Sequence, residues 1–134
     1  MSLFELREDE RGKTYVLKET LRVLIPEISH KTILAYPGFE HDLDTFVINL
    51  PDEVPPTIHD FLYVHRIFED GTPCSRKQAD LYYYKLNQRS SDPGRRKRAT
   101  RTYIGVRLCG WIFWYRRKAI PIPENVKHLY GSYS

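Results

Sequence analysis

The sequence predicts an α+β protein: a small N-terminal antiparallel sheet, then an ordered loop, then two to three packed helices. Runs rich in β-branched and apolar residues occupy the first third of the chain, and apolar residues recur at helical spacing in the second half. The length of 134 residues suits a single domain that can bury a core. We divide the domain into a sheet region, a ligand loop, a helical part and an irregular tail, at residues 1–36, 37–56, 57–118 and 119–134.

Three strand candidates lie in the sheet region. Residues 14–18 and 20–25 are close enough to form a hairpin, and residues 31–36 form the third candidate. Pro37 and Gly38 then signal a turn. The ligand loop that follows shows no persistent period, so we expect an ordered loop.

The helical part begins after two prolines. Pro55 and Pro56 suit a first helical turn because their missing N–H groups would have no partner there. This helix is expected over about residues 57–68. Ser75 and Gln78 then form a capping box that starts a second helix.

A third helix is expected over about residues 100–115. Its apolar side chains recur at helical spacing. Residues 90–98, which precede it, are polar and basic and are expected to form a connector. The tail contains Pro121 and Pro123 and is expected to be irregular.

Composition excludes several classes of protein. With 41% hydrophobic, 13% aromatic and 28% charged residues, the chain is not a disordered tail, a collagen or a coiled coil. No apolar run approaches the roughly 18 residues of a membrane span, and the N-terminal residues lack a signal-peptide pattern. We therefore expect a soluble protein without a transmembrane segment.

The sequence contains two cysteines, Cys74 and Cys109. They stand in no Cys-x-x-Cys pair, and two reduced thiols are favoured over one disulfide.

The net charge of +4 is concentrated in the C-terminal third, over residues 95–118. A basic segment suits an anionic partner. Residues 107–118 combine cations with Trp111, Trp114 and Tyr115. They are interpreted as a core helix with a solvated end, a helix in a lipid headgroup layer, or a nucleic-acid contact. The core helix is favoured because apolar residues surround most of it.

The candidate chemistry centres on His59. Tyr63 lies one helical turn after His59, so both occupy one helix face. Asp80 follows His59 by 21 residues on the next helix, and antiparallel packing would bring it to the imidazole. A carboxylate that holds one ring nitrogen leaves the other to take a proton from water. The competing interpretation is structural, because a histidine commonly finds a polar partner and Asp80 could pair with an arginine.

Other carboxylates suggest a metal. Asp60 beside His59, with Asp42 and Asp44 in the ligand loop, offers the oxygen ligands that calcium prefers. The competing interpretation of Asp42 and Asp44 is turn formation. A tetrahedral zinc site at His41, Asp42, His59 and Asp60 ranks last.

Four motifs follow one another over about residues 31–114. They are Pro37-Gly38-Phe39-x-x-Asp42-Leu43, His59-Asp60-x-Leu62-Tyr63, Ser75-Arg76-x-x-Ala79-Asp80 and Val106-Arg107-x-x-Gly110. Together they resemble the bacteriophage domain-of-unknown-function family 1353. The resemblance implies a phage or prophage origin, and so a place in the host cytoplasm or the virion, but no activity.

A second resemblance is to phospholipase A2, through His-Asp-x-x-Tyr on one helix and an aspartate on its partner. It implies that His59 is the general base, that Asp80 orients it and that Tyr63 donates to this pair. Asp60 would bind calcium, with Asp42 or neighbouring carbonyls as the other protein ligands, and the calcium would polarise the ester carbonyl.

Two classes of function follow from these patterns. The first is a calcium-dependent hydrolase that acts on envelope lipid or another ester during phage entry or lysis. The second is a non-catalytic virion component or host-directed binding module on the same scaffold. Expected partners are a phospholipid surface or another phage or host protein, ahead of nucleic acid.

Overall fold

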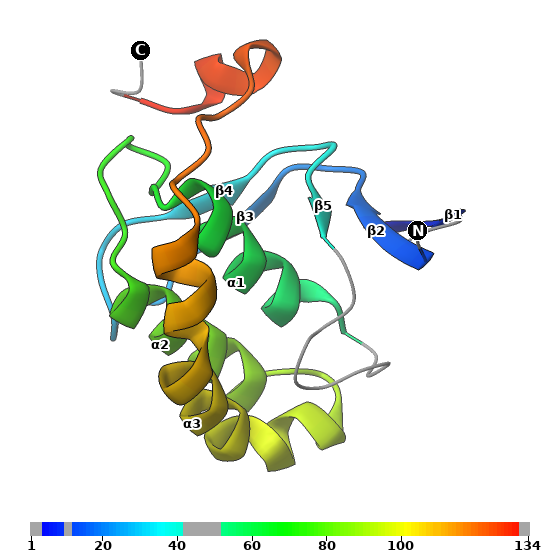
Figure 1. Ribbon diagram of the computed structural model, residues 1–134, viewed down its shortest axis with the longest axis vertical. Helices are drawn as coiled ribbons and strands as arrows, with labels where there is room; N and C mark the ends of the chain where they lie inside the picture. The colour runs from blue at the N-terminus through cyan, green and yellow to red at the C-terminus, as the bar shows by residue number, and fades with distance from the viewer. Residues whose placement is uncertain (1–3, 10–11, 42–51, 132–134) are drawn as a thin grey trace.

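The computed structural model describes residues 4–9, 12–41 and 52–131 of the chain. In these residues, short strands fill the N-terminal third and helices follow them, which confirms the expected α+β class (Figure 1). The strands make two small antiparallel sheets rather than one.

The first sheet has the order β1-β2-β5, and the second pairs β3 with β4. The five strands are β1 (Phe4–Asp9), β2 (Gly12–Leu17), β3 (Leu21–Val23), β4 (Ile33–Ala35) and β5 (Glu40–His41). The candidate strand at residues 31–36 is therefore confirmed as β4, whereas β5 falls inside the expected loop.

The expected hairpin between residues 14–18 and 20–25 is wrong, because these segments belong to different sheets. The connection between them contains no Gly, Asn or Asp to form a tight hairpin turn. Leu17 instead bonds the turn after β4: its amide donates to the Phe39 carbonyl at 2.9 Å, and its carbonyl accepts from Gly38 at 2.7 Å. Gly38 has φ +97°, a conformation that side chains rarely adopt.

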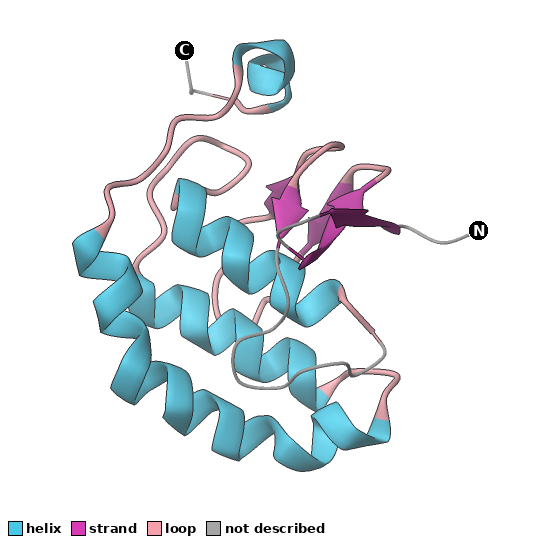
Figure 2. Cartoon of the chain, turned by 45° about the vertical axis from the view of Figure 1, so that its right-hand side comes forward, coloured by secondary structure: helices cyan, strands magenta, loops and turns pink. Residues whose placement is uncertain are grey.

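Three helices lie side by side in one layer (Figure 2). They are α1 (Val54–His65), α2 (Arg76–Gln88) and α3 (Pro93–Arg116). Helix α1 is next to the strands, α2 runs antiparallel to it in the middle, and α3 forms the outer edge of the layer.

Helix α1 begins at Val54 with both prolines in its first turn, as expected, but ends three residues before Phe68. Arg66 ends the helix because it adopts a left-handed conformation with φ 58°. Its guanidinium then donates to the carbonyls of Trp114 and Arg117, at 2.6 and 2.8 Å. These bonds join the end of α1 to the end of α3. The capping box of Ser75 and Gln78 at the start of α2 is confirmed.

Helix α3 begins at Pro93, so the expected connector over residues 90–98 is wrong from residue 93 onward. Asp92 caps the helix by accepting from the Arg95 amide at 2.9 Å, and Pro93 occupies the first turn. An aspartate followed by proline is a strong signal for a helix start. The helix therefore begins there and includes the basic residues that follow. The expected irregular tail contains a 3₁₀ helix, η1 (Glu124–Leu129).

The favoured interpretation of α3 as a core helix is also wrong. Its inner face packs on α2, but Ile104, Leu108, Trp111 and Tyr115 are exposed. No further element follows on the outer side of α3 to cover these side chains among the described residues (Figure 2).

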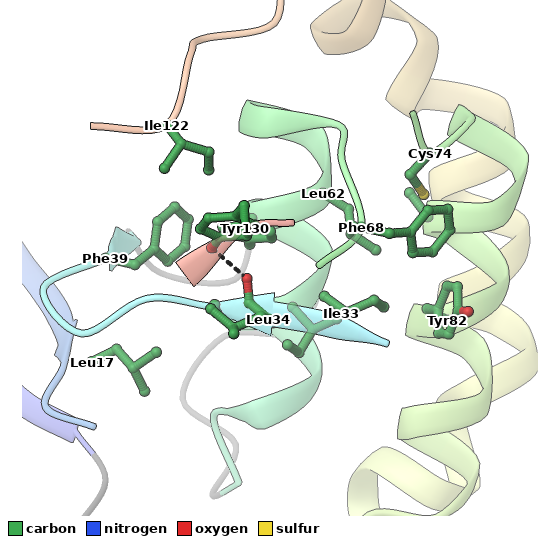
Figure 3. Packing of buried hydrophobic residues seen from close by; sticks show 14 of the residues in the cluster. Leu17, Ile33, Leu34, Phe39, Leu62, Phe68, Cys74, Tyr82, Ile122 and Tyr130 are labelled. Atoms are coloured by element: carbon green, nitrogen blue, oxygen red, sulfur yellow. Dashed lines mark hydrogen bonds between the residues drawn. The ribbon is translucent and has the colours of Figure 1, made fainter. Parts of the chain in front are cut away.

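The hydrophobic core lies between α1, the strands and the C-terminal segment (Figure 3). Tyr130 enters it from the C-terminal side, and its buried hydroxyl donates to the Leu34 carbonyl at 2.6 Å. The amide of Gly131 donates to the Glu69 carbonyl at 2.8 Å. The C-terminal segment therefore completes the core instead of trailing from it. Labelled members of the cluster in Figure 3 are Leu17, Ile33, Leu34, Phe39, Leu62, Phe68, Cys74, Tyr82, Ile122 and Tyr130.

The two cysteines are free, as expected. Burial raises the pKa of the Cys74 thiol to about 12, so it packs as a small apolar side chain. Cys109 is exposed on α3. In the described part of the chain, no helix has both the length and the apolar character that crossing a membrane requires.

A buried histidine joins α1 to the segment after α3. His65 Nδ1 lies 2.6 Å from the Ile120 carbonyl, and Nε2 lies 2.8 Å from the Tyr36 hydroxyl. A carbonyl can only accept, so Nδ1 carries the proton and Nε2 accepts from Tyr36. Burial lowers the pKa of His65 from its ordinary 6.5, more than the bond to Ile120 raises it. His65 is therefore neutral in the folded protein.

We expect this histidine to make stability depend on pH. Below pH 6.5 His65 binds a proton in the unfolded chain but stays neutral in the folded protein. Protonation therefore stabilises the unfolded state, and the free energy of unfolding falls as pH drops. Urea denaturation at pH 7.5 and 5.5 measures the loss. His65→Gln should show a smaller loss between these pH values than the wild type, whereas the exposed-site control His128→Gln should match the wild type. Equal losses in wild type and His65→Gln would contradict this expectation.

Candidate functional site

The structure brings His59, Tyr63 and Asp80 together between α1 and α2. His59 Nε2 lies 2.9 Å from Asp80 Oδ1, and the Tyr63 hydroxyl donates to the same oxygen at 2.6 Å. His59 and Tyr63 occupy one face of α1 because they are one turn apart. Helix α2 runs antiparallel to α1 (Figure 2), and the bonds to His59 and Tyr63 show that its Asp80 lies opposite that face.

Asp80 is fully buried, and cations surround its second oxygen. Arg107, from the inner face of α3, donates to Asp80 Oδ2 at 2.8 Å, and Arg76 lies 3.5 Å from it, one turn before on α2. Burial alone would raise the pKa of Asp80. The hydrogen bonds from His59, Tyr63 and Arg107 outweigh that effect and hold its pKa below 3.8. Asp80 is therefore a carboxylate at neutral pH.

The ionised carboxylate of Asp80 determines which ring nitrogen of His59 carries the proton. A carboxylate can only accept, so Nε2–H donates to it and the neutral ring presents the lone pair of Nδ1. In the described residues, no hydrogen bond engages Nδ1, and 15% of the His59 side chain is exposed. The face of the imidazole ring stacks on Tyr83, with centroids 4.3 Å apart and planes at 13°. This packing also fixes the orientation of the ring.

The side chain of Tyr63 packs against α3. Its ring packs edge-on against Trp114 at 5.1 Å between centroids. Burial, followed by the bond to Asp80, raises the pKa of its hydroxyl, which stays protonated and donates. Gly110 makes room for this hydroxyl: a Cβ at position 110 would lie 2.4 Å from it. The glycine thus lets three helices meet at Asp80.

The expected metal ligands are only partly described. Asp60 follows His59 on α1 and is half-buried. Asp42 and Asp44 lie outside the described residues, and so does any arrangement they make with Asp60. Within the described residues, no group of three or more His, Cys, Asp or Glu side chains could hold a metal ion. The calcium site stays a prediction, as does the zinc alternative.

Several residues of this site had no assigned role in the sequence analysis. Arg76 and Arg107 pair with Asp80, Tyr83 supports His59, and Gly110 admits Tyr63. Asn87, one turn beyond Tyr83, is also buried, and in the described part of the chain neither of its amide atoms has a hydrogen-bond partner. Periodicity could have found Asn87, because it shares a face of α2 with Asp80 and Tyr83.

The chain matches no protein-family model, no curated protein and no solved structure. The resemblances to family 1353 and to phospholipase A2 therefore stay predictions.

Proposed function

We propose that the protein is an ester hydrolase in which His59, held by Asp80, activates water. One observation carries the proposal: a fully buried carboxylate lies 2.9 Å from Nε2, while Nδ1 is left as the basic atom. This is the arrangement that a histidine general base requires.

The proposed reaction keeps its protons in balance. As water attacks the carbonyl carbon of the ester, Nδ1 of His59 takes one of its protons. The imidazolium that forms is stabilised by the negative charge of Asp80. The same proton then goes to the leaving alkoxide as its bond to carbon breaks, and the neutral ring is restored. Tyr63 keeps Asp80 in place throughout.

Calcium belongs to the proposal as a cofactor. Asp60 supplies a carboxylate beside His59, and Asp42 and Asp44 would complete the ligands with loop carbonyls. A bound cation would polarise the ester carbonyl. The phage origin that the sequence resemblance implies would place the reaction on envelope lipid, during entry or lysis, by a protein of the host cytoplasm or the virion.

A non-catalytic binding module is the second candidate, and the arginines favour it. Arg76 and Arg107 already balance the charge of Asp80, as in a buried ion-pair network that only holds three helices together. In that case His59 is a further structural partner of the carboxylate, and the protein is a virion component or a host-directed module.

Replacing His59 with asparagine should separate these candidates. If His59 is the base, hydrolysis of a short-chain fluorogenic phospholipid or a p-nitrophenyl ester should fall about 100-fold or more. The control variant His128→Gln changes an exposed histidine on η1, outside the three helices, and should retain full activity.

Two results would reject the hydrolase. One is equal hydrolysis by the wild type and His59→Asn; the other is no hydrolysis above background by the wild type, with and without added calcium. Either result leaves the binding module as the better candidate. A thermal melt of each variant shows whether lost activity reflects lost fold.

A further inference from the structure

The outer face of α3 carries a continuous apolar stripe. Ile104, Leu108, Trp111 and Tyr115 are 52%, 68%, 50% and 73% exposed. At about 100° per residue, these four positions fall within an arc of roughly 60° on the helix. The opposite face is buried on α2 through Ala99, Thr102, Val106 and Gly110. We call the four exposed residues the outer stripe.

Only positive charge surrounds the outer stripe along the chain. Residues 93–123 contain nine Arg and Lys and no Asp or Glu. Seven of these cations are exposed, and they lie near the two ends of the stripe. They are Arg96, Lys97, Arg98 and Arg101 before it, and Arg116, Arg117 and Lys118 after it.

The apolar stripe and the cations at its ends favour one of three possible partners: a second copy of the chain, a nucleic acid or an anionic bilayer. A second copy of α3 would set exposed cations against cations in either direction of pairing, which disfavours self-association. The phosphates of a nucleic acid would pair with the arginines, but they would make no apolar contact with Ile104 and Leu108. An anionic bilayer satisfies both: its headgroups attract the cations at the ends, and its interface accepts Trp, Tyr and aliphatic side chains.

We propose that the outer stripe of α3 docks the protein on a membrane surface rich in anionic phospholipid. The helix lies in the plane of the interface, with its inner face still packed on α2. Docking itself does not require His59 to be catalytic. Only the further step, that the membrane is the source of the ester, rests on the proposed function.

Co-sedimentation with vesicles tests this docking. The full chain should bind vesicles of equal parts phosphatidylcholine and phosphatidylglycerol, and should bind phosphatidylcholine alone at least about 10-fold less, since anionic headgroups attract each exposed cation near the surface. Binding should weaken as salt rises. The double variant Leu108→Ser/Trp111→Ser should lose about 10-fold or more, because two large apolar side chains no longer enter the interface.

Matched variants isolate the stripe. Leu24→Ser removes an apolar side chain that is equally exposed, at 51%, but lies outside α3, and it should bind as the wild type does. Arg101→Glu/Arg116→Glu should lose binding to the anionic vesicles. His59→Asn should retain it, so a failure of docking and a failure of hydrolysis are distinguished.

Three results would overturn the proposal. The first is that the wild type binds neutral and anionic vesicles equally, or binds neither. The second is that the stripe variant binds as the wild type does. The third is an assignment to another partner: tight binding to duplex DNA, or a dimer in sedimentation velocity, that the stripe variant abolishes while vesicle binding persists.

Discussion

Asp80→Asn is expected to lower the free energy of unfolding by about 3 kcal/mol. The carboxylate is fully buried and receives hydrogen bonds from His59, Tyr63 and Arg107 on three sides. Asparagine keeps the shape but removes the charge, so Arg76 and Arg107 are left near a neutral amide. We expect the low end of the range for broken buried pairs because 30% of the Arg107 side chain is exposed and can find water.

An exposed ion pair supplies the control for this experiment. Asp70 accepts from Lys31 at 2.6 Å, but the two side chains are 50% and 43% exposed. Asp70→Asn should therefore cost at most about 1 kcal/mol, although the bonds from Lys31 and Thr72 lower the pKa of Asp70 to about 2. Urea denaturation of both variants gives the comparison. If Asp80→Asn costs no more than Asp70→Asn, Asp80 does not hold the helices together.

Gly110→Ala is expected to destabilise the protein although alanine favours a helix. The new Cβ would meet the Tyr63 hydroxyl at 2.4 Å, and that hydroxyl is fixed by Asp80 and by the packing of its ring on Trp114. Overpacking of this kind typically costs about 1–3 kcal/mol. The gain in helix propensity, about 1 kcal/mol, offsets only part of that cost.

A double-mutant cycle makes this prediction specific. In a Tyr63→Phe background the hydroxyl is gone and the nearest ring atom is 3.3 Å from the Cβ, so Gly110→Ala should destabilise the protein clearly less than it does in the wild type. Gly131→Ala is the control in the wild-type background, because its Cβ would approach no atom closer than 3.4 Å. The same destabilisation by Gly110→Ala in both backgrounds would show that Tyr63 is not the obstacle.

The sequence was sufficient to bring His59, Tyr63 and Asp80 together. Two of them are one turn apart on a helix, and the third lies on the next helix, whose start is fixed by the capping box of Ser75. Local spacing and one short connection thus determine this part of the site. The fold class was predictable for the same reason, since strands and helices are segregated along the chain.

Other features depend on contacts that no local pattern encodes. Arg107 reaches Asp80 from 27 residues away on a third helix, and its long side chain could have faced solvent instead. The pairing of β2 and β3 with separate partners depends on where the Pro37-Gly38 turn packs. The exposure of α3 could not be predicted either, because an apolar helix normally indicates burial. Nothing in its own residues shows that no element of residues 4–9, 12–41 and 52–131 covers its outer face.

The position of Tyr130 in the core governs when the protein can finish folding during synthesis. Its hydroxyl bonds a carbonyl 96 residues earlier, and Ile120 and Gly131 make further backbone bonds to Val64 and Glu69. A nascent chain that has exposed only the strands and the first two helices presents an open core, with an apolar gap where Ile122, Val126 and Tyr130 belong. Contacts of such separation form slowly. The ribosome must therefore release residues 120–131 before the core closes, and until then the nascent chain is a substrate for chaperones.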